Sequence, residues 1–95
     1  MRVLAVTGLL AEDIVKRSAS ETGKEIDVVS LPITVAAFIT PEYAANLLKR
    51  MDLRSYDMIL MPGSVQGDVS SVEEATGIPT FKGTIRAAED RKSVV

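Results

Sequence analysis

The chain has 95 residues, of which 46% are hydrophobic and 25% charged, and its formal net charge is −2. This composition indicates one small globular domain, because a disordered chain would carry fewer apolar residues. Acidic and basic residues are interspersed without a basic stripe, which argues against nucleic acid as a partner.

Cysteine and histidine are absent, which excludes disulfides and thiol nucleophiles and removes the commonest general base and metal ligand. The apolar runs fall far short of the roughly 20 residues that a membrane helix needs, and the start lacks the pattern of a signal peptide. We therefore expect a cytoplasmic protein with no metal site, no bound cofactor and no membrane partner.

The first third of the chain predicts a strand, a helix and a second strand. Residues 2–7 (RVLAVT) form a short apolar run that is typical of a buried parallel strand. Apolar residues then recur at helical spacing, which predicts a helix whose buried side carries Leu10, Ile14, Val15 and Ala19. Gly23 stands where a left-handed cap would end that helix, and residues 26–31 (IDVVSL) predict the second strand. A unit of this kind has a right-handed crossover.

Residues 33–39 (ITVAAFI) lack a clear period and predict either an irregular link packed on the sheet or a short helix. The run Thr40-Pro41-Glu42 has the chemistry of a helix start, since threonine caps, proline suits the first helical position and glutamate complements the dipole. Helical spacing continues through Ala44, Leu47, Leu48 and Met51.

The stretch from Asp57 to Asp68 (DMILMPGSVQGD) is the centre of the predicted architecture. Residues 58–61 form an apolar run of strand length, and a polar loop with two glycines follows. Open α/β sheets place their ligands beside loops of this kind, because such loops lie beyond the carboxyl end of a buried strand. We therefore expect Leu60 to be buried in the middle of the sheet.

The last third predicts a short helix and a brief strand. Ser70 with Glu73, and Ser71 with Glu74, have the capping-box spacing, and Gly77 ends the helix that they start. Residues 78–81 predict an edge strand, because Pro79 interrupts it. Residues 84–90 predict a last helix, and Val94-Val95 the opening of a fifth strand. Unpaired edge strands also predict a homodimer formed through such an edge.

Together the elements predict an α/β fold with three layers, a flavodoxin-like or Rossmann-like parallel sheet of about four strands in the order 2-1-3-4, and helices on both faces. The carboxyl ends of strands one, three and four then meet at one rim. Its candidate ligand-binding residues are Thr7, Gly8, Gly63, Ser64, Gly67, Asp68, Lys82 and Gly83.

This rim has the chemistry to bind a polar or anionic small molecule. Glycines expose backbone amides, and Asp68 with Lys82 is the obvious charged pair. Each residue type also has a purely structural explanation. The glycines can form a tight turn, the serines can cap a helix, and the lysine can be a solvated surface residue. No dinucleotide fingerprint, Walker motif or nucleophile elbow is present, and no catalytic residue is assigned.

Four stretches resemble a known family: VTGLLAE at 6–12, LPITVAAFITPE at 31–42, DMILMPGSVQGDVSSVEEATGIPTFKG at 57–83, and the following AAED. They are similar to the amino-terminal domain of the archaeal dihydropteroate synthase-like proteins, which are associated with the biosynthesis of tetrahydromethanopterin. The resemblance implies that residues 1–95 are one α/β domain of a longer protein. It also implies that a pterin-binding (β/α)8 barrel follows and carries any transfer to an aminobenzoate-type acceptor.

Two functions follow as hypotheses. In the first, the chain is an accessory domain that binds a ligand or docks on the barrel and does no chemistry of its own. In the second, it is a small enzyme domain in which Lys82 and Asp68 act on an anionic small molecule at the rim. The second hypothesis requires both side chains to reach one ligand atom.

Overall fold

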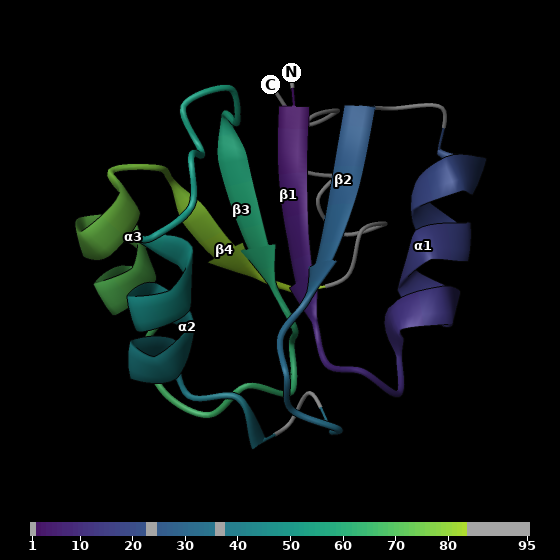
Figure 1. The fold of residues 1–95 in the computed structure, drawn as a ribbon, viewed down its shortest axis with the longest axis horizontal. Helices are drawn as coiled ribbons and strands as arrows, with labels where there is room; N and C mark the ends of the chain where they lie inside the picture. Colours follow the sequence, from purple (N-terminus) through teal and green to yellow (C-terminus); the bar gives the residue numbers. More distant parts are fainter. Residues whose placement is uncertain (1, 23–24, 36–37, 84–95) are drawn as a thin grey trace.

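A computed structural model describes residues 2–22, 25–35 and 38–83 and shows one parallel sheet with helices on both faces (Figure 1). The strand order is β2-β1-β3-β4, as the sequence predicts, so the α/β fold is confirmed. In chain order, the elements are β1 (Arg2–Thr7), α1 (Glu12–Glu21), β2 (Glu25–Ser30), α2 (Pro41–Leu48), β3 (Met58–Met61), α3 (Ser70–Thr76) and β4 (Thr80–Lys82).

Strand β3 lies between β1 and β4, and all four of its side chains are buried. Its backbone pairs in parallel with both neighbours, with Ile59 opposite Leu4 on one side and Thr80 on the other. Leu60 is 4% exposed, as the apolar run predicts. A continuous apolar strand of this kind is stable only where both faces of the sheet are covered.

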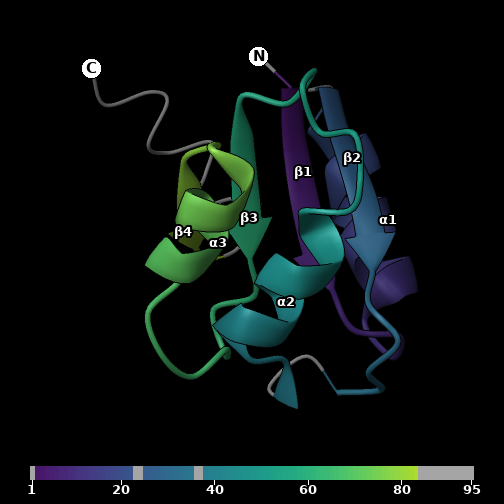
Figure 2. The ribbon, with the colours of Figure 1, turned by 60° about the vertical axis from the view of Figure 1, so that its left-hand side comes forward.

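Helices cover both faces of the sheet (Figures 1 and 2), and each face carries a separate apolar core. On one face, alternate strand residues such as Val6 and Met61 pack with Leu48 of α2 and Val72 of α3. On the other face, the intervening residues pack with Ala19 of α1. Successive side chains of a strand point to opposite faces, so each central strand contributes to both cores.

The start of α2 is confirmed in detail. The Thr40 side chain accepts a hydrogen bond from the backbone N–H of Tyr43 at 3.1 Å, and Pro41 occupies the first turn. The helix ends at Leu48, so the prediction that Met51 continues its buried side is wrong. The backbone N–H of Met51 donates to the Leu48 carbonyl in a closing turn, and the Met51 side chain is exposed.

The predicted buried side of α1 is wrong at its start. Leu10 is 71% exposed and Ile14 is 67% exposed, whereas Ala19 is buried and Val15 is half-buried. The helix begins only at Glu12. The preceding loop is held against the segment after β2, since the N–H groups of Leu9 and Leu10 donate to the carbonyls of Ile33 and Thr34. Val15 and Ala19 of α1 therefore pack against the sheet, whereas Leu10 and Ile14 do not.

The capping boxes predicted for α3 are also wrong. The residue at the cap position is Val69, and no side chain caps the helix from there. Glu73 instead accepts a hydrogen bond from the backbone N–H of Thr80 at 3.0 Å, which ties α3 to the start of β4. The buried hydroxyl of Ser71 has no hydrogen-bond partner among the described residues, so it does not serve Glu74. Gly77 ends the helix as predicted, in the left-handed conformation with φ of 74°.

Several boundaries differ from the prediction by a residue or two. Strand β4 begins at Thr80, after Pro79, and it ends the sheet within the described residues. Of the segment 33–39, residues 33–35 form an irregular link and Phe38 lies in a 3₁₀ turn, while Ile39 is buried in the core with residues of α2 and α3. The cap predicted at Gly23, the helix over 84–90 and the strand opening at Val94-Val95 lie outside the described residues.

Candidate functional site

The carboxyl ends of the strands share one edge of the sheet, which we call the carboxyl rim (the lower edge in Figure 1). Thr7 and Gly8 lie there and are buried. Gly63 and Gly83 are close neighbours, because a Cβ added to Gly63 would lie 3.6 Å from the Gly83 Cα. The N–H of Gly83 also donates to the Met61 carbonyl at 3.0 Å. The loops after β3 and β4 therefore meet, as the predicted topology requires.

Lys82 organises the loop between β3 and α3. Its ammonium nitrogen donates to the Val65 carbonyl at 3.0 Å and to the Gly67 carbonyl at 2.8 Å. The Val65 side chain is buried in the core, whereas Ser64 and Gly67 are exposed. Gly67 has a φ of 99°, which favours glycine. The loop is thus anchored at its apolar centre and bound from β4 by one cation.

Asp68 has a different partner. Its carboxylate accepts a hydrogen bond from the backbone N–H of Ser70 at 2.9 Å, at the first turn of α3. No ion pair joins Lys82 to Asp68 within the part of the chain that the structure describes. The structure therefore brings the predicted residues to one rim, yet it does not aim this charged pair at a common point.

The start of α1 is acidic. Glu12 lies in its first turn, where the Ser30 hydroxyl donates to the Glu12 carboxylate and the Lys16 ammonium lies 3.7 Å from it. Glu12 and Asp13 both lie in this first turn, and their negative charges would repel a phosphate there.

Apolar side chains gather at the rim beside these residues, and sequence reasoning missed them. Two loops held together by the hydrogen bonds of Leu9 and Leu10 carry exposed large hydrophobic residues. Phe38, whose N–H donates to the Val35 carbonyl, is 73% exposed. The group, which we call the apolar rim patch, consists of Leu9, Leu10, Ile14, Val35 and Phe38. The signal in the sequence was the Leu-Leu pair directly after Gly8, of which helical spacing assigned Leu10 to the core.

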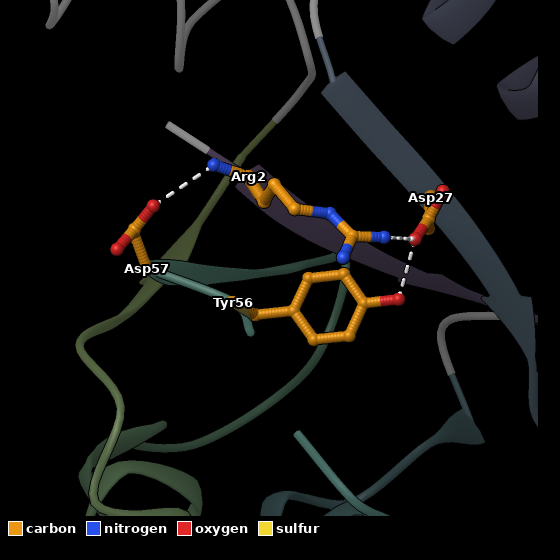
Figure 3. A network of polar contacts seen from close by, with 4 residues as sticks. All are labelled: Arg2, Asp27, Tyr56 and Asp57. Atoms are coloured by element: carbon orange, nitrogen blue, oxygen red, sulfur yellow. Dashed lines mark hydrogen bonds and ion pairs between the residues drawn. The ribbon is translucent and has the colours of Figure 1, made fainter. Parts of the chain in front are cut away.

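A polar network lies at the opposite, amino end of the sheet (Figure 3). The carboxylate of Asp27 accepts hydrogen bonds from the Arg2 guanidinium at 2.7 Å and from the Tyr56 hydroxyl at 2.5 Å. The Arg2 guanidinium also lies 5.0 Å from the centre of the Tyr56 ring, a favourable cation–π geometry. Asp57 accepts from the backbone N–H of Arg2 at 2.9 Å. The network joins β1, β2 and the segment before β3.

This network shifts the acidity of two groups. The hydrogen bond from Tyr56, followed by the contacts with Arg2, lowers the pKa of Asp27 below its ordinary value. The same hydrogen bond raises the pKa of Tyr56. Asp27 therefore stays ionised and Tyr56 stays protonated at neutral pH. These shifts follow from long-range pairs, which no local sequence pattern indicates.

Two further observations concern metals and membranes. Within residues 2–22, 25–35 and 38–83, no group of three acidic, histidine or cysteine side chains is arranged to hold a metal ion. No helix in that part of the structure combines the length and the apolar character needed to cross a bilayer.

Comparisons with known proteins give one family and one relative. A family model described as a family of unknown function (DUF6513) matches residues 1–85. The protein of Methanocaldococcus jannaschii named Uncharacterized protein MJ0107 is 38% identical over 96 aligned residues, which cover 94% of this chain. The match spans 18% of that relative, so the chain is about a fifth as long as its relative. No solved structure matches the chain significantly.

Proposed function

The chain belongs to the DUF6513 family, and from that premise we propose that it acts as an accessory domain that docks, through its carboxyl rim, on the rest of a longer polypeptide. The longer protein would be dihydropteroate synthase-like, with a role in the biosynthesis of a methanopterin- or folate-type pterin in the cytoplasm. The domain itself would do no chemistry. The observation that carries the proposal is the apolar rim patch.

Exposure of that patch is unfavourable for an isolated soluble domain. Leu10 and Phe38 are each more than two-thirds exposed. Burying a side chain of this size contributes roughly 1.5–3 kcal/mol, and clustered exposed hydrophobic residues mark interaction sites more often than single ones do. Ile14 of the patch lies on α1, and the loops that carry Leu9, Leu10 and Val35 are joined by backbone hydrogen bonds, so this part of the patch is ordered without a partner.

The proposed occupant follows from the length of the relative. Over four-fifths of the M. jannaschii protein lies outside the matched region. A domain within a longer chain meets its neighbours at high effective concentration, so a patch of modest area is sufficient for docking. The pterin assignment rests on the resemblance of the 57–83 block to dihydropteroate synthase-like proteins.

The enzyme hypothesis receives less support from the geometry. Lys82 donates to two loop carbonyls, and Asp68 accepts from the start of α3. Both side chains would have to break these hydrogen bonds with the backbone to reach a ligand. Binding of a polar ligand by the backbone of Gly63 is compatible with docking at the same rim, whereas the N–H of Gly83 already donates to Met61.

The test is a binding titration in trans. The M. jannaschii polypeptide without the matched segment, once circular dichroism shows it to be folded, is titrated with this chain by calorimetry. We expect a complex with a dissociation constant in the micromolar range. The double variant Leu10→Ser/Phe38→Ser should bind at least about tenfold more weakly, because two exposed apolar side chains no longer become buried.

Met51→Ser is the matched control, since Met51 is also an exposed hydrophobic side chain but lies at the amino end of the sheet. This control should bind as the unmodified chain does. Absence of any complex, or equal affinity of the rim variant and the control, would refute docking through the rim. The pterin assignment is tested separately, since the folded remainder should quench the fluorescence of an added pterin on binding it.

A further inference from the structure

A hollow at the amino end of the sheet, on the side opposite the carboxyl rim, has features of a ligand site. It lies between the segment before β3 and the segment between α3 and β4, which are at the top of Figure 1. Its volume is about 730 Å³, within the range of roughly 300–1,000 Å³ that is usual for small-molecule sites. The mouth is wide, so a ligand would enter without a rearrangement of the backbone.

Part of the inner surface of the hollow is apolar. Leu53 and Ile78 line it and keep a small exposed area, whereas Leu48 lies beneath them and is fully buried. Tyr56 also lines the hollow, and its hydroxyl is held by Asp27, which fixes the position of the ring. A flat apolar group placed here would contact surface that is already ordered, so binding would cost little conformational entropy.

The mouth of the hollow is cationic. Lys49, Arg50 and Arg54 line it together with one acidic residue, Asp52. Asp52 is engaged by Arg54 through both the Nε atom, at 3.1 Å, and a terminal guanidinium nitrogen, at 3.2 Å. Lys49 and Arg50 form no ion pair with any described carboxylate. This local excess of positive charge stands out because the whole chain carries −2.

We propose that the hollow binds a small phosphomonoester whose apolar or aromatic ring rests on Leu53 and Ile78. Its phosphate group, with a charge of about −1.5 to −2 at neutral pH, would lie between Lys49 and Arg50. Leu53 and Ile78 would contact the ring. Lys49 and Arg50, which have no ion-pair partner among the described carboxylates, would contact the phosphate. Stabilisation of the end of α2 explains one cation at that position, yet it does not explain a second unpaired cation on the edge of a preformed, partly apolar hollow.

The test uses phenyl phosphate as the probe and the full 95-residue chain. Binding is followed by the chemical shifts of backbone amides in a ¹H–¹⁵N spectrum. Phenyl phosphate should shift the amides of residues 48–56 and 75–78 and should bind at least about tenfold more tightly than inorganic phosphate, because only phenyl phosphate would contact Leu53 and Ile78.

The double variant Lys49→Ala/Arg50→Ala should weaken phenyl phosphate binding at least about tenfold while its spectrum stays that of a folded protein. The matched control is Lys16→Ala/Arg17→Ala, which removes the same charge from an adjacent lysine–arginine pair on α1 and should change the affinity less than about twofold. Equal affinity for inorganic phosphate, shifts elsewhere in the chain, or equal losses in the two double variants would overturn the proposal.

Discussion

Replacing Lys82 by methionine tests the role that the structure gives this residue at the rim. Methionine keeps most of the apolar stem but removes the ammonium group and therefore both hydrogen bonds to the carbonyls of Val65 and Gly67. A hydrogen bond from a charged donor contributes roughly 1.5–3 kcal/mol where it is shielded. Lys82 is exposed, so water competes, and we expect about 0.5–1 kcal/mol for each bond. The free energy of unfolding should thus fall by about 1–2 kcal/mol.

Urea denaturation monitored by circular dichroism measures this loss, and Lys49→Met is the matched control. Lys49 is also an exposed lysine, and it forms no ion pair with the described carboxylates, so its replacement should change the free energy of unfolding by less than about 0.5 kcal/mol. Hydrogen exchange should also become faster at the amide of Val65 in the Lys82 variant. Equal stability of the two variants would refute the view that Lys82 holds the loop.

Three further substitutions test the amino-end network, the α3 cap and the core. In Tyr56→Phe, the pKa of Asp27 should rise toward its ordinary value near 3.8, as carbon NMR of the carboxyl group would show. A lowered carboxyl pKa contributes stability above the unfolded-state pKa and loses it as the pH falls through the folded-state pKa. The stability gap between Tyr56→Phe and the unmodified chain should therefore be full near about pH 6 and shrink below about pH 4, and a gap independent of pH would contradict this. Gly77→Ala should cost about 1–2 kcal/mol in thermal unfolding, because alanine is strained at φ of 74° although the space around it is open, and an unchanged midpoint would argue against the observed cap. Met61→Ala should cost about 2–5 kcal/mol in urea denaturation, since Met61 is fully buried, whereas exposed Met51→Ala should cost little, and similar costs would place Met61 outside the core.

The central strand was predictable because its signal is local. Residues 58–61 are all apolar and are bounded by Asp57 and Pro62, and the structure places β3 at those residues with all four side chains buried. The order of the strands was predicted from the alternation of strands and helices by analogy with flavodoxin-like sheets. The Thr40 cap was equally local, since its hydroxyl accepts a hydrogen bond from the backbone N–H of Tyr43, three residues later.

The failures arise where long-range contacts override a local pattern. Ser70 and Glu73 have the spacing of a capping box, yet the Glu73 carboxylate accepts a hydrogen bond from the backbone N–H of Thr80 at the start of the next strand. Leu10 and Ile14 fit the helical period, yet both side chains are exposed, and the backbone of Leu10 is held by a hydrogen bond to Thr34 in a neighbouring loop. In each case a contact with a residue distant along the chain is involved, and local periodicity carries no information about such contacts.

The sequence predicted which residues lie at the carboxyl rim, but not which contacts their side chains make. Parallel topology brought Gly8, Gly63 and Gly83 to one rim, as expected. The separate engagements of Lys82 and Asp68 depend on the path of the loop between β3 and α3, which the sequence does not specify. The cationic hollow likewise joins segments that are far apart in the chain.

Docking through the carboxyl rim is the central claim, and hydrogen–deuterium exchange tests it most directly. The chain is labelled alone and in the presence of the M. jannaschii polypeptide that lacks the matched segment. We expect slower exchange in residues 8–14 and 33–35, with no change in residues 49–56. Protection confined to residues 49–56, or no protection at all under conditions where calorimetry detects a complex, would contradict it.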